Sequence, residues 1–169
     1  MITEVLGLVG VVLALLGWGR MSRQRQTIWQ NQRADSISGI DVVTYLAMFL
    51  SFLVYGIWLQ SPTMIALGVI RTWQMTPITL GFFKFGDVRK VHWVLAVIAT
   101  LSLLVMTIES YAASAFFVIN TAGVGAATAQ AYAIWRARSR GDVVLGVRVY
   151  YLIAVICWSV FGWLKGDLV

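Results

Sequence analysis

The chain has 169 residues, of which 60% are hydrophobic and only 12% charged, and it carries a net charge of +6. A soluble domain of this size is about half apolar and about a quarter charged, so the composition excludes an ordinary water-soluble domain and predicts an all-α membrane protein. One cysteine, Cys157, and one histidine, His92, leave no disulfide framework or metal cluster, and we expect no cofactor. The basic residues lie in short loops between apolar runs, which indicates membrane topology and not nucleic-acid binding.

Six apolar runs approach the length of about 20 residues that a membrane-spanning helix needs. They cover residues 2–18, 42–59, 62–83, 91–108, 113–135 and 149–164. The first run lacks the basic start and cleavage site of a signal peptide, so we interpret it as a span whose helix continues past Arg20. Gln60 and Ser61 form a short corner before the third run, and Pro62 suits the first turn of the helix that follows.

The positive charges separate by side if six spans cross a membrane. Eleven of the thirteen lysines and arginines fall in the segments after the first, third and fifth runs, which six spans would place on one face. Because basic loops stay in the cytoplasm, this pattern predicts an outside N-terminus and cytoplasmic basic loops. We therefore expect an integral protein of the plasma (inner) membrane, with the lipid bilayer as its main partner.

The segment 17–56 occurs twice in the chain. With a shift of 106 positions, ten of its forty residues are identical in 123–162, whereas chance would give about three. The starts of the two copies are four runs apart, so both copies cross in the same direction. Parallel repeats are one of the common plans of membrane transporters. The alternative is duplication of structure without transport.

The repeated residues resemble the PQ-loop unit of the SWEET and SemiSWEET sugar transporters. The motif glutamine is matched by Gln24 and Gln130, and the end of the second helix by Phe52-x-x-Tyr55-Gly56 and Trp158-x-x-Phe161-Gly162. The resemblance implies a three-helix repeat in residues 1–84, a linker helix in 85–112 and a second repeat in 113–169. Gln24 and Gln130 lie near the predicted cytoplasmic ends, where they are candidates either to gate the inner mouth or to cap broken backbone.

Three departures from the family pattern stand out. Arg23 and Ala129 replace both motif prolines, which in the family bend the first helix. The second repeat lacks its third helix, which a homo-oligomer, a partner or a truncated chain would explain. The pocket asparagine of the family's third helix falls at or next to Arg71.

Arg71 is the most informative candidate, because it lies near the middle of the third run. An arginine there costs about 2.5–3.5 kcal/mol and should face the bundle interior. It suits bidentate binding of a carboxylate or phosphate. The alternatives are a structural arginine bonded to backbone carbonyls and an arginine that snorkels to the membrane surface because the helix register differs.

Other residues are candidates to line a substrate site beside Arg71. Trp73 and Gln74 adjoin it. Asn120 lies about one third into the fifth run, where its amide could line a pocket or bond to a neighbouring helix. Phe52, Tyr55 and Trp158 are candidates by the resemblance. Each aromatic residue has helix packing or the interfacial belt as its alternative role.

We do not expect the protein to be an enzyme, because its sequence shows no nucleophile–base pair, Walker motif or cluster of metal ligands. Acidic residues are missing from the centres of the spans, which disfavours proton coupling. The sequence therefore predicts a facilitative transporter of a sugar or another small polar or anionic solute by alternating access. The alternative is a non-transporting receptor or scaffold of the same fold that binds an anionic ligand near Arg71.

Overall fold

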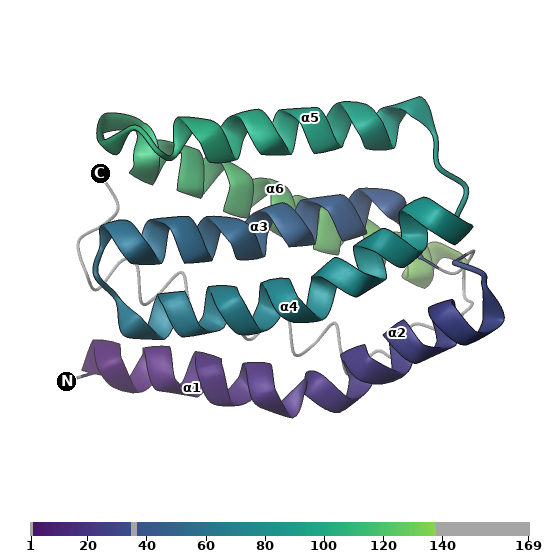
Figure 1. Cartoon of the computed structure of the whole chain (residues 1–169), viewed down its shortest axis with the longest axis horizontal. Helices are drawn as coiled ribbons and strands as arrows, with labels where there is room; N and C mark the ends of the chain where they lie inside the picture. Colours follow the sequence, from purple (N-terminus) through teal and green to yellow (C-terminus); the bar gives the residue numbers. More distant parts are fainter. Residues whose placement is uncertain (1, 35–36, 138–169) are drawn as a thin grey trace.

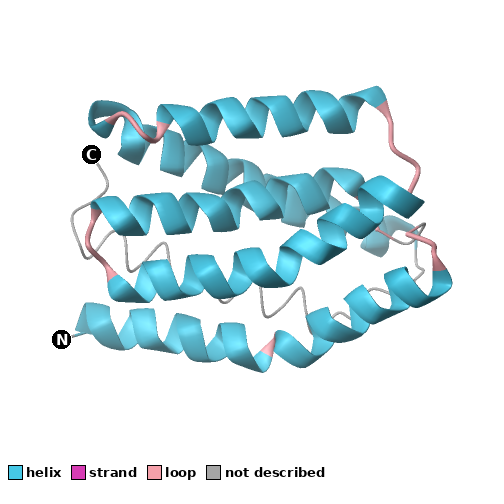
Figure 2. Cartoon of the chain, viewed as in Figure 1, coloured by secondary structure: helices cyan, strands magenta, loops and turns pink. Residues whose placement is uncertain are grey.

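The computed structural model describes residues 2–34 and 37–137, and every regular element in these ranges is a helix (Figures 1 and 2). The predicted all-helical fold is therefore confirmed for this part of the chain. The helices are α1 (Ile2–Leu16), α2 (Trp18–Asn31), α3 (Gly39–Trp58), α4 (Pro62–Phe85), α5 (Lys90–Val105) and α6 (Glu109–Ala137).

These helices do not correspond one to one with the six predicted spans. The first predicted span and its basic continuation form α1 and α2, which are separated at Gly17 (Figure 2). The next four predicted spans are α3 to α6, and the sixth lies outside the described residues. The start of α3 moves from residue 42 to Gly39, because Ser38 caps the helix and its side chain accepts a 3.4 Å hydrogen bond from the backbone N–H of Asp41.

Helix α3 lies at the centre of the described bundle. Helices α4, α5 and α6 all pack against it, while α1 and α2 pack against α4 (Figure 1). Residues on nearly every side of α3 are buried, as expected of a helix surrounded by others. The end of α2, the start of α3, the end of α4 and the start of α5 lie at one end of the bundle (Figure 1). Two predicted basic segments thus meet at the same end.

A tight turn joins α3 to α4. Gln60 adopts the left-handed conformation with φ 50°, and the N–H of Ser61 donates to the carbonyl of Gly56 at 2.9 Å. The N–H of Gln60 donates to the carbonyl of Ile57 at 3.2 Å, and the two bonds together form the Schellman pattern of a helix end. Pro62 then begins α4, as the sequence predicts. This turn holds the two helices in an antiparallel hairpin.

Two glycines allow α3 and α4 to approach closely. A Cβ atom on Gly68 would lie 2.5 Å from the backbone nitrogen of Leu53, and one on Gly56 would lie 2.9 Å from that of Ile65. Because backbone atoms cannot rotate away as a side chain can, any larger residue would push the helices apart.

The outer surface is rich in large apolar side chains. On α5 only His92 is buried, whereas Trp93, Val97 and Leu101 are all more than half exposed. Further exposed apolar residues lie on α1, α4 and α6, and include Leu8, Leu16, Val69, Leu80, Phe117 and Val118. Exposed apolar side chains beyond a few scattered ones indicate a surface that contacts another protein or a membrane.

By length and composition, only α3 among the described helices could cross a membrane. Helices α1 and α5 are short, with 15 and 16 residues, and would span only about 24 Å at about 1.5 Å per residue. In α4, Arg71 and Gln74 interrupt the apolar run. The predicted runs 2–18 and 91–108 extend past the ends of α1 and α5, because they included the turns at 17 and 106–108, whereas α3, α4 and α6 are longer than the runs that predicted them.

We predict that Gly68→Ala destabilises the protein by about 1–3 kcal/mol, the usual cost of overpacking. Thermal unfolding in detergent micelles measures this loss. Gly19→Ala is the matched control, since nothing lies within 4 Å of a Cβ at that position; alanine should be neutral there or should stabilise α2 by up to about 1 kcal/mol. Equal unfolding temperatures for the two variants would contradict the close approach.

Candidate functional site

Arg71 lies on the buried stripe of α4. The buried residues of this helix recur every three or four positions: Met64, Leu67, Gly68, Arg71, Gln74, Met75, Ile78, Thr79, Gly81 and Phe82. This spacing is one helix face, and Arg71 stands in its middle with only 3% of its surface exposed. Val69, Trp73 and Leu80 lie on the exposed side. Helix α4 therefore turns Arg71 inward and these apolar side chains outward.

The guanidinium of Arg71 has polar and aromatic neighbours. Its Nη1 donates to Oε1 of Gln74 at 3.0 Å, and its central carbon lies 5.9 Å from the ring centre of Phe49 on α3. A cation near an aromatic face is stabilised by the ring quadrupole. The burial of Arg71 agrees with the prediction that it faces the bundle interior, and its predicted neighbour Gln74 is in direct contact with it.

Gln74 is the second polar group of this site. It is 6% exposed, and its Nε2 has no hydrogen-bond partner among the described residues. An amide N–H buried without a partner costs about 1–3 kcal/mol. The carbonyl of Gln74 is thus used by Arg71, while its amide group remains a donor for an acceptor such as a carboxylate or hydroxyl.

A separate group of predicted residues lies between α3 and α6. Nδ2 of Asn120 donates to Oγ of Ser51 at 3.2 Å and to the carbonyl of Phe116 at 2.8 Å. The Phe116 ring stacks on Tyr55 at 4.5 Å and meets Phe52 edge to face at 5.2 Å. The structure therefore brings Phe52, Tyr55 and Asn120 together, around an aromatic residue on α6.

Three members of these groups did not emerge from the sequence. Ser51 is completely buried and joins Asn120 to α3, while Phe116 and Phe49 supply the central rings of the two groups. Helical spacing contains the signal, because Ser51 lies four positions before Tyr55 and Phe116 four before Asn120. Motif positions alone select Phe52 and Tyr55 and miss their neighbours.

The remaining candidates are placed elsewhere or lie outside the description. Trp73 is 69% exposed and does not share the buried stripe with Arg71. Two residues that are two positions apart in the chain point about 200° apart around a helix with about 3.6 residues per turn. Gln24 is exposed on α2. Gln130 belongs to α6, and Trp158 lies outside the described residues. The sequence adjacency of Trp73 to Arg71 was therefore misleading.

Two bends interrupt α4 and the helices that pack on it. The first separates α1 from α2 at Gly17, and the second is in α4, where Pro77 interrupts the helix ladder (Figure 1). The indole N–H of Trp29 donates to the carbonyl of Pro77 at 3.0 Å. Helix α2 is thereby attached to α4 at the position where α4 bends.

Contacts beyond this bond join α2 to the last turns of α4. A Cβ on Gly81 would lie 2.7 Å from Cγ2 of Ile28, and Trp29 meets Phe85 edge to face at 5.5 Å. Helix α1 instead approaches the start of α4, where a Cβ on Gly7 would lie 2.8 Å from Oγ1 of Thr63. The segments before and after the bends thus form two separately packed pairs.

The two copies of the sequence repeat differ at their glycines. Gly17 separates two helices, whereas Gly123, its counterpart, lies within the uninterrupted α6. Gly123 packs on α3, and a Cβ there would lie 2.8 Å from Sδ of Met48. The same residue therefore permits a bend in the first copy and a close helix contact in the second.

We predict that Ser51 and Asn120 are energetically coupled. A double-mutant cycle of Ser51→Ala and Asn120→Ala, measured by thermal or denaturant unfolding in micelles, should give about 0.6–1.7 kcal/mol, as for hydrogen bonds between membrane helices. Ser51→Ala paired with Thr100→Ala serves as the control, because Thr100 bonds within α5. Additive effects in the first cycle would show that the α3–α6 bond contributes nothing.

Comparisons of the chain with protein-family models, with curated proteins and with solved structures found no match.

Proposed function

We propose that this chain is a facilitative membrane transporter of the SWEET-like type, which carries a small polar or anionic solute by alternating access. The observation that carries the proposal is the buried Arg71–Gln74 pair, located in the central helix contact of a bundle with an apolar exterior.

The distribution of side chains supports a location in a bilayer. Exposed positions of α1, α5 and α6 hold valine, leucine, isoleucine and phenylalanine, while an arginine and a glutamine are buried in α4. Water favours the opposite distribution. In lipid, apolar side chains suit the exterior, and ionisable residues face the bundle interior and mark substrate pathways.

The chemistry of the buried pair supports a solute with an acceptor group. Arg71 supplies a buried guanidinium, and a guanidinium binds carboxylates through parallel hydrogen bonds. The free amide donor of Gln74 adds a second direction of binding. Phe49 offers a ring face beside the cation. A small organic anion or a hydroxyl-rich solute meets these groups better than an apolar one does.

The bends at Gly17 and Pro77 support movement of part of the bundle. Helix α2 and the end of α4 pack on each other, and α1 packs on the start of α4. Rotation at both bends would move the first pair as one body relative to the second. Gly17 and Pro77 thus replace the hinge proline that both repeat copies lack. A facilitator fits because the span centres hold no acidic residue for proton coupling.

The same buried cation favours one other function. A non-transporting receptor or scaffold would use Arg71 to bind an anionic ligand, and its guanidinium is already enclosed by Gln74 and Phe49. Counterflow in proteoliposomes separates the two functions. We expect exchange of a labelled sugar or organic acid against the same solute inside the vesicle. Saturable binding without any exchange would establish the receptor and reject transport.

We predict that Arg71→Asn weakens solute affinity about tenfold or more, because a hydrogen bond to a charged group contributes about 1.5–3 kcal/mol. Counterflow measured over a range of solute concentrations gives this change. Val69→Ala is the matched control on the exposed side of α4 and should behave as the unmodified protein. Unchanged affinity and unchanged solute selectivity in Arg71→Asn would show that Arg71 is not part of the binding site.

We predict that Trp29→Phe slows exchange a few-fold and leaves solute affinity unchanged. The variant keeps an aromatic ring but loses the hydrogen bond to Pro77, with a net value of about 0.5–1.5 kcal/mol. The comparison needs both the maximal exchange rate and the half-saturating concentration. Trp93→Phe, on the exposed face of α5, is the control. A change in affinity at constant maximal rate would contradict a role in movement.

A further inference from the structure

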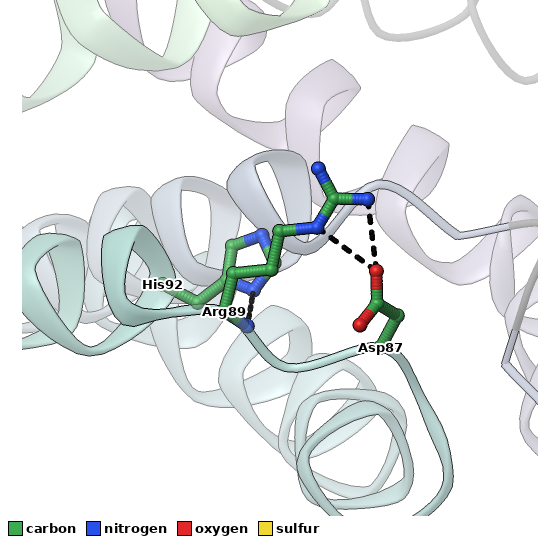
Figure 3. A network of polar contacts seen from close by, with 3 residues as sticks. All are labelled: Asp87, Arg89 and His92. Carbon is green, nitrogen blue, oxygen red and sulfur yellow. Dashed lines mark hydrogen bonds and ion pairs between the residues drawn. The ribbon is translucent and has the colours of Figure 1, made fainter.

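Three chain segments with basic residues meet at one end of the bundle. The C-terminal half of α2 packs on the last turns of α4 through Ile28 and Trp29. The start of α5 is joined to α4 by the ring of His92, which lies edge to face with Phe82 at 5.2 Å. The backbone N–H of Arg89 donates to Nδ1 of His92 at 3.0 Å and fixes the first turn of α5 (Figure 3).

These segments carry a set of exposed cations that we call the basic rim. Its members are Arg23, Arg25, Arg33, Lys84, Arg89 and Lys90. Among the described residues at this end, Asp87 is the exposed acid, and it pairs with Arg89 at 2.8 Å (Figure 3). Asp41 is buried. The rim therefore presents a clear excess of positive charge.

Aromatic side chains lie directly beside these cations. Nζ of Lys84 is 5.5 Å from the ring centre of Trp29 and 5.1 Å from that of Phe85. Trp29 is fixed by its bond to Pro77 and is still 40% exposed. Trp93 is also exposed, at the start of α5. Tryptophan collects at the headgroup level of a bilayer, where its ring meets apolar chains and its N–H meets polar groups.

We propose that the basic rim binds the phosphate-bearing headgroups of anionic phospholipids. Apolar helix faces adjoin the rim, and Lys84 lies against aromatic rings at the boundary between the two. A phospholipid likewise has a charged headgroup next to apolar chains, so its two parts match the rim and the apolar faces. Each lysine or arginine near an anionic leaflet contributes a favourable interaction. The inference rests on the membrane location in the proposed function, but it does not depend on transport.

The test uses the purified full chain in neutral detergent micelles, titrated with dansyl-labelled phosphatidylglycerol or dansyl-labelled phosphatidylcholine. Energy transfer from tryptophan to dansyl reports binding. We expect a preference for phosphatidylglycerol that falls as salt is raised. A variant in which four cations are neutralised should lose this preference: Arg25→Gln, Arg33→Gln, Lys84→Gln and Lys90→Gln. Its affinity for phosphatidylglycerol should fall about fivefold for each removed charge that contacts the lipid.

A charge-preserving variant provides the matched control. Arg25→Lys, Arg33→Lys, Lys84→Arg and Lys90→Arg together should retain the preference for phosphatidylglycerol. Equal binding of the two lipids by the unmodified protein would overturn the proposal, as would unchanged binding in the glutamine variant. Full displacement of the labelled lipid by inorganic phosphate at constant ionic strength would also overturn it, in favour of a site for free phosphate.

Counterflow on the same preparations keeps the two proposals apart. Lipid preference without solute exchange would reject transport and leave the basic rim assigned. Solute exchange without lipid preference would reject the basic rim as a lipid site and leave transport supported.

Discussion

The arrangement of the bundle depends on the burial of one charge in an apolar chain. Burying a charged group is costly unless it has partners, so Arg71 needs polar or aromatic neighbours wherever α4 is packed. Its burial against α3 fixes the rotation of α4, because Gln74 and Met75 must then face inward while Val69, Trp73 and Leu80 face outward. The orientation of a single guanidinium thereby determines which apolar face the protein offers to its surroundings.

Close packing between α3 and α4 makes this burial possible. Gly56 and Gly68 bring the two backbones together, and this short separation adds dispersion contacts between the two helices. Because α3 also contacts α5 and α6, it connects the Arg71–Gln74 pair on one side with the Ser51–Asn120 group on the other. Both polar groups are thus supported by one central helix.

Sequence reasoning could predict the helical class, the corner at Gln60 and Ser61, and the burial of Arg71, since each follows from local chemistry or from the cost of burying charge. It failed where tertiary packing decides. Trp73 adjoins Arg71 in the chain but lies on another helix face. The break at Gly17 and the continuity of α6 at Gly123 come from the same repeated residue, so only the neighbours, Met48 among them, distinguish the two outcomes. The motif prolines missing from the repeats drew attention away from Pro77, which lies inside a predicted span. Pro77 bends α4, and Trp29 of α2 bonds to its carbonyl.

The short turn between α3 and α4 has a consequence for how the protein is made. Among the described helices, α3 alone is long and apolar enough to cross a bilayer, whereas α4 bears an arginine whose insertion would cost about 2.5–3.5 kcal/mol. The Schellman turn at Gln60 and the helix start at Pro62 let α4 fold back immediately. Under the proposed function, the two helices would leave the translocon as a preformed hairpin, and the arginine would meet its aromatic neighbour before it meets lipid.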